Sequence, residues 1–270
     1  MIAFMLSSAL SFGQTKSNEA RLQLVRNATL VIDYAGKKIL VDPMFSKKGA
    51  IDSWAGIAKN PTVELKMPVK DIIKNIDLVV VTHTHEDHFD KPASSALSKS
   101  IELIMPPTDK DFFIKEGFIN ATVLQDQKVW NGITITRVDG QHGTGAVLKQ
   151  MGETSGFIFQ AKNQPTIYLV GDTVLTDNVL NTIKKFNPDY IIVNSGGAMI
   201  RSFGLIPIIL DEDQTMTLIG ESGKAKVIAV HMDALDHCFT TRSILKNKAE
   251  VLQITEDKLI IPQDGEIIKL

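Results

Sequence analysis

The chain has 270 residues, of which 44% are hydrophobic and 22% charged, and this globular composition excludes a disordered chain, a coiled coil and a polytopic membrane protein. A chain of this length buries roughly 70–75% of the surface that its unfolded state exposes, so it needs no disulfide or metal merely to form a core. Its 29 basic and 31 acidic residues give a net charge of −2 without a run of five like charges, which excludes an electrostatic footprint for nucleic acid.

The first twenty residues differ from the rest of the chain. An apolar run at residues 2–10 is followed by small residues and then by a polar segment, which resembles a secretory signal peptide cleaved after Gly13. The run is too short to span a bilayer. We therefore expect a signal peptide and tail at residues 1–20, one domain at residues 21–270, and a periplasmic or secreted protein without stable membrane insertion. A cytoplasmic protein is the alternative, because no Lys or Arg precedes the run.

Three short β-favouring segments come next, the last two joined as a hairpin: residues 22–25, 29–33 and 38–42. The following stretch, residues 45–68, is punctuated by Gly and Pro and lacks periodicity, which predicts a long ordered loop. The aromatic residues Phe45 and Trp54 of this loop have two possible roles: they form a wall of a substrate pocket, or they only fix the loop. We expect substrate selection to depend on this loop and on residues 195–212.

Helices and strands then alternate to the end of the chain. A short helix at residues 69–75 precedes residues 77–82, a continuous apolar run typical of a strand buried on both faces. Further strands are predicted at residues 101–105, 122–124, 133–138, 156–160, 166–170, 190–194, 227–230 and 259–261. Further helices are predicted at residues 93–99, 109–116, 176–186, 213–221 and 240–248, and we expect the acidic residues 211–213 to cap the fourth of these. No linker or short repeat interrupts the pattern, which indicates a single α/β domain.

The segment directly after the buried strand is the most informative one, with the sequence Thr82-His83-Thr84-His85-Glu86-Asp87-His88. Alternation along a strand end places His83 and His85 on one side, and the turn that follows brings Asp87 and His88 beside them. Neutral imidazoles and carboxylates are ligands that suit zinc, iron or manganese. A metal site is therefore the default interpretation of this segment.

Four ligands so close in sequence cannot all serve one tetrahedral ion, so further ligands are expected at other strand ends. His142 lies in a Gly-flanked turn, Asp172 follows the predicted strand at residues 166–170, and His231 follows the one at residues 227–230. Asp172 can bridge two ions, and each of the two His can complete one ion.

In chain order, these motifs resemble the five motifs of the metallo-β-lactamase superfamily, beginning with Asp42 and the segment at residues 83–88. The resemblance runs from about residue 22 to the C-terminus and implies a four-layered αββα sandwich with its site at one edge of the sheets. Segments 26–29, 171–173 and 231–238 are similar to the branch that contains ascorbate-6-phosphate lactonase and N-acylphosphatidylethanolamine phospholipase D.

The resemblance also implies a dinuclear site for two divalent ions, with zinc expected first and manganese or iron as alternatives. The first ion would be held by His83, His85 and His142, and the second by Asp87, His88 and His231, with Asp172 between them. Asp42 would orient a ligand. The hydroxide shared by the ions would attack a small ester, lactone or phosphodiester.

Four further residues are expected to lie near this site. His237 is expected, with Asp87, to act in catalysis by donating a hydrogen bond to the substrate, and a structural histidine is the alternative. Asn194 is expected to line the substrate pocket, although a strand-to-helix turn also explains the glycines after it. Asp236 stands where the branch more often has Asn, which changes the expected polarity of the pocket. Cys238, the single cysteine, is interpreted as a buried thiol.

Three other functions compete with that of a small-molecule hydrolase. A nuclease or other phosphodiesterase of the same superfamily is the first alternative, but only 29 residues separate His142 from Asp172, too few for an inserted RNA-processing domain. A redox diiron role is disfavoured because His85 stands where that branch has Glu. A non-catalytic metal-binding periplasmic protein is the alternative from another class. We expect a small-molecule substrate and no nucleic-acid partner, and a homo-oligomer is left open.

Overall fold

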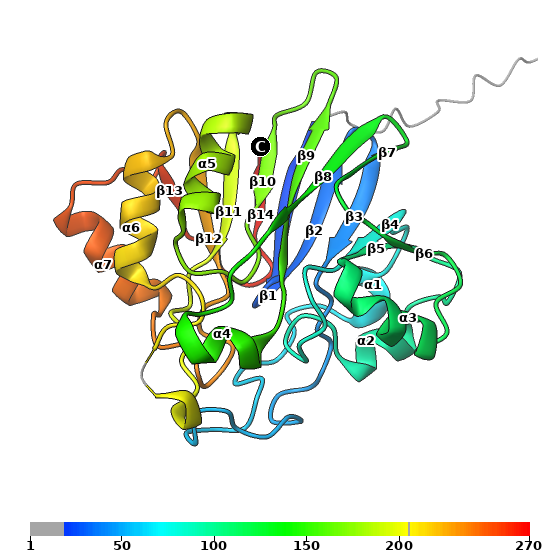
Figure 1. Cartoon of the computed structure of the whole chain (residues 1–270), viewed down its shortest axis with the longest axis horizontal. Helices are drawn as coiled ribbons and strands as arrows, with labels where there is room; N and C mark the ends of the chain where they lie inside the picture. The colour runs from blue at the N-terminus through cyan, green and yellow to red at the C-terminus, as the bar shows by residue number, and fades with distance from the viewer. Residues whose placement is uncertain (1–18, 205) are drawn as a thin grey trace, which may run out of the picture.

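A computed structural model describes residues 19–204 and 206–270 as two seven-stranded sheets packed face to face (Figure 1). The first sheet has the order β14-β1-β2-β3-β4-β5-β6 and contains β1 (Arg21–Arg26), β2 (Thr29–Tyr34), β3 (Lys37–Val41), β4 (Leu78–Val80), β5 (Glu102–Met105), β6 (Ala121–Val123) and β14 (Ile267–Lys269). The predicted signal segment lies, apart from its last two residues, outside the described residues.

The second sheet has the order β13-β12-β11-β10-β9-β8-β7. Its strands are β7 (Gln127–Trp130), β8 (Ile133–Asp139), β9 (Ser155–Ala161), β10 (Ile167–Leu169), β11 (Tyr190–Asn194), β12 (Lys226–Val230) and β13 (Leu259–Ile260). Strands β3 to β6 are parallel neighbours in the first sheet, and β10 to β13 are parallel neighbours in the second. The carboxyl ends of these strands therefore gather along one edge of each sheet.

Helices cover the outer face of each sheet (Figure 1). The first sheet carries α1 (Val69–Ile72), α2 (Lys91–Ala96) and α3 (Lys110–Lys115), and the second carries α5 (Asp177–Phe186), α6 (Glu212–Glu221) and α7 (Arg242–Val251). These layers confirm the predicted αββα sandwich. A further helix, α4 (Gly145–Met151), lies with the 45–68 loop at one end of the sandwich (Figure 1). No helix in the described part of the chain is long and apolar enough to cross a membrane.

Strand β4 shows why its sequence is continuously apolar. Leu78 and Val80 point into the core between the sheets, whereas Val79 packs with the helices on the outer face. All three are buried, because alternate side chains of a covered central strand face opposite apolar layers. The prediction of a strand buried on both faces is confirmed.

Two strands and one α-helix escaped prediction: β7, β14 and α4. Both strands lie at sheet edges, and their burial alternates or is partial, so their sequences mix polar and apolar residues. Helix α2 begins at Lys91, earlier than predicted, because the Asp90 side chain caps it by accepting a hydrogen bond from the Ala93 N–H. The predicted cap of α6 is confirmed, since Asp211 accepts from the Gln214 N–H.

Asp90 also joins the helix to the long loop, so we expect Asp90→Ala to destabilise the protein by about 3 kcal/mol. Its buried carboxylate accepts hydrogen bonds from the Phe45 N–H (2.8 Å), the Ser46 N–H (2.6 Å) and the Ala93 N–H (2.8 Å), and the substitution leaves all three donors without this acceptor. Urea unfolding is expected to show a lower midpoint with an unchanged slope.

The control is Asp71→Ala, at an exposed acidic residue in the first turn of α1. We expect that variant to change the free energy of unfolding by less than about 0.5 kcal/mol. Equal, small effects of both substitutions would contradict the structural role given to Asp90.

Candidate metal centre

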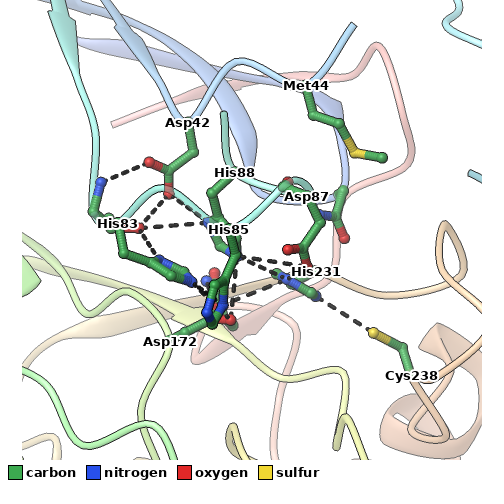
Figure 2. A network of polar contacts seen from close by, with 12 residues as sticks. Asp42, Met44, His83, His85, Asp87, His88, Asp172, His231 and Cys238 are labelled. Atoms are coloured by element: carbon green, nitrogen blue, oxygen red, sulfur yellow. Dashed lines mark hydrogen bonds and ion pairs between the residues drawn. The ribbon is translucent and has the colours of Figure 1, made fainter. Parts of the chain in front are cut away.

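The predicted metal ligands meet at the edge where the strand ends gather, and Figure 2 labels all of them except His142. The segment at residues 83–88 follows β4, His142 follows β8, Asp172 follows β10 and His231 follows β12. Segments far apart in the sequence thereby bring five imidazoles and two carboxylates into one cluster. Every one of the seven predicted ligands lies in it.

The cluster divides into two groups whose ligand atoms all lie within 4.8 Å of one another. The first group is His83, His85 and His142, and the second is Asp87, His88, Asp172 and His231. In the first group, His83 Nε2 and His85 Nδ1 are 2.9 Å apart. In the second, His231 Nε2 lies 3.3 Å from Asp87 Oδ2 and 3.2 Å from His88 Nε2. This division matches the two ligand sets that the resemblance implies.

Asp172 lies between the two groups. Its Oδ2 atom is 3.5 Å from His142 Nε2 and 3.9 Å from His83 Nε2 in the first group. The same oxygen is 3.2 Å from His88 Nε2, and Oδ1 is 3.8 Å from His231 Nε2, in the second group. A carboxylate in this position can contact an ion in each group.

The far side of each of four imidazoles has its own partner in the protein. His88 Nδ1 lies 2.8 Å from Asp42 Oδ2, and His142 Nδ1 lies 2.7 Å from the carbonyl oxygen of Ile208. His83 Nδ1 is 3.1 Å from Thr82 Oγ1, and His231 Nδ1 is 3.4 Å from Cys238 Sγ. Such partners fix the tautomer and orientation of a metal-ligating imidazole and leave the opposite nitrogen free for the ion.

Asp42 is itself held in place. Its carboxylate accepts hydrogen bonds from the Thr82 N–H and from the Thr82 hydroxyl, both at 2.7 Å (Figure 2). Asp42 and His231 both have a positive φ, 43° and 65°, which non-glycine residues rarely adopt. Each therefore turns its side chain back from a strand end at a cost that the surrounding contacts must offset.

Asn194 and the glycines after it are placed differently from the prediction. The Asn194 side chain is buried behind Asp172, where Nδ2 donates a hydrogen bond of 2.6 Å to Asp172 Oδ1, so it orients that carboxylate and does not line the pocket. A Cβ on Gly196 would stand 2.2 Å from the carbonyl oxygen of His231. Close approach of two strand ends, and not a strand-to-helix turn, therefore requires that glycine.

Burial and neighbouring charges shift the pKa values of the side chains in the cluster. Burial alone would lower the pKa of His88, but the carboxylates of Asp172, Asp87 and Asp42 raise it to about 10. Burial would raise the pKa of Asp172, but His88 and His231 hold it well below its usual value. In the first group burial dominates, and it lowers the pKa of His142 to about 4.

These residues fit a divalent metal. Two ligands of a tetrahedral zinc ion lie roughly 3.3 Å apart when each bond is about 2.0–2.1 Å long. The contacts between the ligand atoms of the cluster, from 3.2 to 3.9 Å around Asp172 and His88, are of that size. The buried carboxylates and imidazoles also need a compensating partner, which a cation supplies.

Four residues of the cluster, His85, Asp87, His142 and Asp172, open into a cavity of about 290 Å³. Its lining residues are Trp54, His85, Glu86, Asp87, His142, Gln150, Met151, Asp172, Ile200, Phe203, Ile208 and His237. His237 is one of these lining residues, whereas Phe45 is buried in the core with the helices of the first sheet and only fixes the loop. Gln150 and Met151 were missed with α4, although Val147 and Met151 have the spacing of one helix face.

The fold and the His/Asp cluster at its strand ends define the chain as a metal-dependent hydrolase of the metallo-β-lactamase superfamily. Residues 37–232 match the beta-lactamase superfamily domain. The UPF0173 protein YddR of Bacillus subtilis is 33% identical over 248 residues, which cover 90% of this chain and 96% of that protein. The chain belongs to the UPF0173 metal-dependent hydrolase family.

Two solved structures are similar over nearly their whole length. A possible metal-dependent hydrolase from Veillonella parvula has a TM-score of 0.89 and 33% identity, covering 93% of this chain and 100% of that one. An isothiocyanate hydrolase from Delia radicum gut bacteria has a TM-score of 0.86 and 36% identity, covering 93% of this chain and 98% of that one. These matches support the superfamily, and none of them identifies the lactonase and phospholipase branch.

Proposed function

We propose that the protein is a dinuclear metal hydrolase that acts on a small, uncharged substrate with an electrophilic carbon, and that isothiocyanates are the first class to test. The observation that carries the proposal is Asp172, whose carboxylate contacts both ligand groups beside the cavity. Zinc suits this set of imidazoles and carboxylates, with manganese or iron as alternatives. When bound, two such ions supply a hydroxide nucleophile at neutral pH and polarise the substrate.

The lining of the cavity favours an uncharged substrate over a phosphodiester. None of the described residues that line it is Lys or Arg, and Glu86 adds a carboxylate to those of Asp87 and Asp172. Burial and the neighbouring carboxylates of Asp90 and Asp87 raise the pKa of Glu86, as expected in a negative environment. Enzymes that transfer or cleave phosphate groups commonly add Arg or Lys side chains to any metal ions on the phosphate oxygens, and the described lining residues offer neither.

The similar isothiocyanate hydrolase suggests which electrophile to choose. Addition of water to an isothiocyanate, R–N=C=S, gives a thiocarbamate that breaks down to the amine R–NH₂ and carbonyl sulfide, so all atoms balance without another reactant. Negative charge develops on nitrogen or sulfur during the attack. Small esters and lactones share the electrophilic carbon and are the second class to test.

The chain's own residues then have distinct tasks. Asp172 and Asp87 balance the positive charge of the site, and Asp42 holds the ring of His88 in the orientation that presents Nε2. His237 donates a hydrogen bond to the substrate atom that becomes negative. The apolar side chains of Met151, Phe203 and Ile208 exclude water beside the reacting carbon.

The test compares three substrate types on protein of measured metal content. Phenethyl isothiocyanate, p-nitrophenyl butyrate and bis(p-nitrophenyl) phosphate represent the isothiocyanate, the ester and the phosphodiester. We expect about two metal equivalents, and a kcat/KM for the first or second substrate at least about tenfold above that for the third, a difference of about 1.4 kcal/mol in transition-state binding. Two bound metals without hydrolysis of any of the three would favour a non-catalytic metal-binding protein instead.

His237→Phe is expected to lower kcat by about 100-fold, because removal of one hydrogen-bond donor to a developing anion has an effect of that order. The His237 ring is buried, its Nδ1 atom has no hydrogen-bond partner in the described structure, and burial lowers its pKa to about 4, so it is a neutral donor at pH 7. Phe keeps a ring at this position, and the metal content is expected to stay unchanged.

The matched variant is His237→Gln, which keeps a donor in a side chain of similar reach. We expect it to recover part of the rate lost in the Phe variant. If both variants hydrolyse the substrate like the wild type, His237 has only a structural role.

A further inference from the structure

The carboxylate of Asp236 organises the loop that carries Trp54. Six donors from the loop surround it: Ser53 Oγ, the backbone N–H groups of Trp54 (3.1 Å), Ala55 (3.2 Å), Ile57 (3.2 Å) and Ala58 (3.3 Å), and Asn60 Nδ2 (2.8 Å). The backbone N–H of Asp236 in turn donates to Asn60 Oδ1 at 2.8 Å. These donors hold the pKa of Asp236 below its usual value despite burial, so the carboxylate stays ionised.

This placement keeps the Asp236 carboxylate out of the pocket, so Asp in place of Asn adds no charge to the cavity lining. Asp236 is not among the residues that line the cavity, whereas its neighbour His237 is. The two side chains therefore act on opposite sides of one segment. Asp236 faces the loop, and His237 faces the metal centre.

The two aromatic rings on this segment and this loop meet in the cavity wall. The centroids of the Trp54 and His237 rings are 4.9 Å apart, and the ring planes are nearly perpendicular, at 89°. Both rings line the cavity together with Asp87 of the metal centre. An edge-to-face pair of this kind leaves an apolar surface beside the reacting carbon.

We propose that Asp236 is a positioning residue that holds Trp54 against His237, and that this aromatic pair selects substrates carrying an apolar organic group. The selection of substrates rests on the proposed function, whereas the positioning of Trp54 by Asp236 does not. Residues 52–59 contain no helix or strand beyond the isolated bridge between Ile51 and Asn60. Without the carboxylate, the loop N–H groups would turn to water, and Trp54 would leave the wall.

The first measurement reports on Trp54 and does not require activity. The chain has two tryptophans, so Trp130→Phe leaves Trp54 as the single emitter. In that background, we expect Asp236→Asn to shift the Trp54 emission to longer wavelength and to increase its quenching by acrylamide about twofold or more, with unchanged metal content. The matched control is Asp52→Asn, which removes a charge from the same loop at a side chain that is 91% exposed, and it is expected to change neither.

The second measurement tests selection by the wall. We expect Asp236→Asn and Trp54→Ala each to raise KM for phenethyl isothiocyanate about tenfold while leaving KM for methyl isothiocyanate within twofold. Binding of N-phenethylthiourea, an uncharged probe that is not hydrolysed, is expected to weaken by the same factor in both variants when it is measured by isothermal titration calorimetry. The probe keeps the inference testable if the wild type hydrolyses neither isothiocyanate.

The outcomes separate the two proposals. Trp54 emission and quenching that stay unchanged in Asp236→Asn would overturn the positioning role. Altered emission with equal effects on large and small ligands would overturn the selection. A wild type that binds the probe through Trp54 but hydrolyses no substrate would support the aromatic wall and contradict only the proposed function.

Discussion

Asp172→Asn is expected to reduce the bound metal from about two equivalents to one or none and to lower kcat/KM by about 1,000-fold, a loss of several kcal/mol in transition-state stabilisation. The carboxylate is the side chain whose oxygens lie within 3.2–3.9 Å of nitrogens from both ligand groups. An amide offers one neutral oxygen, and its NH₂ group points a donor where an ion needs an acceptor.

The measurement combines elemental analysis with kinetics on the same preparation. Asp139→Asn serves as the control, because Asp139 also ends a strand near the site but its side chain is 76% exposed. That variant is expected to keep both metals and the wild-type rate. An Asp172→Asn protein that retains two equivalents and full activity would show that the carboxylate does not connect the two groups.

The parts of the fold and site that could be predicted depend on local patterns. The continuous apolar run of β4, followed at once by the His-rich segment, marks a buried strand end, and Asp172 and His231 follow apolar runs in the same way. Since parallel neighbours present their carboxyl ends at one edge, strand ends alone bring these ligands together. Ordered motifs then indicated the superfamily, which the domain match confirms.

What could not be predicted depends on contacts between distant segments. Asp236 and its loop partners are 176 to 183 residues apart, so no local pattern reveals that its carboxylate faces the loop and not the pocket. Asn194 is similar, because its contact with Asp172 is set by the neighbouring strands β10 and β11. The sequence of the edge strand β7 shows no alternation of polar and apolar residues, since the apolar residue Val129 stands on its exposed face.

Metal affinity is expected to depend on pH differently for the two ligand groups. In the metal-free protein, burial opposes protonation of His88, but three carboxylates raise its pKa to about 10, and the pKa of His231 is raised well above its usual value by Asp172. Both imidazoles therefore carry protons at pH 7. A metal ion binds only the neutral imidazole, so it must displace these protons.

The sign follows from this competition. The range from pH 6 to pH 8.5 lies below the raised pKa of His88. Over this range, the apparent metal affinity of the second group is expected to rise about tenfold per pH unit for each proton that the ion displaces, since one pKa unit corresponds to about 1.4 kcal/mol. In the first group, burial keeps the pKa of His142 at about 4 and that of His83 well below its usual value. That group is already neutral at pH 6, so its affinity is expected to change little over the same range.

Calorimetric titration of the metal-free protein with Zn²⁺, in buffers of different ionisation enthalpy, measures the metal affinity and the number of protons released at once. We expect one equivalent to bind with little proton release and the other with release of one to two protons at pH 7. Asp42→Asn removes one of the three carboxylates that raise the pKa of His88, at a contact of 2.8 Å, and is expected to reduce the proton release of the second equivalent. Equal proton release for both equivalents, unchanged by that substitution, would contradict the division of the cluster into a neutral group and a charged group.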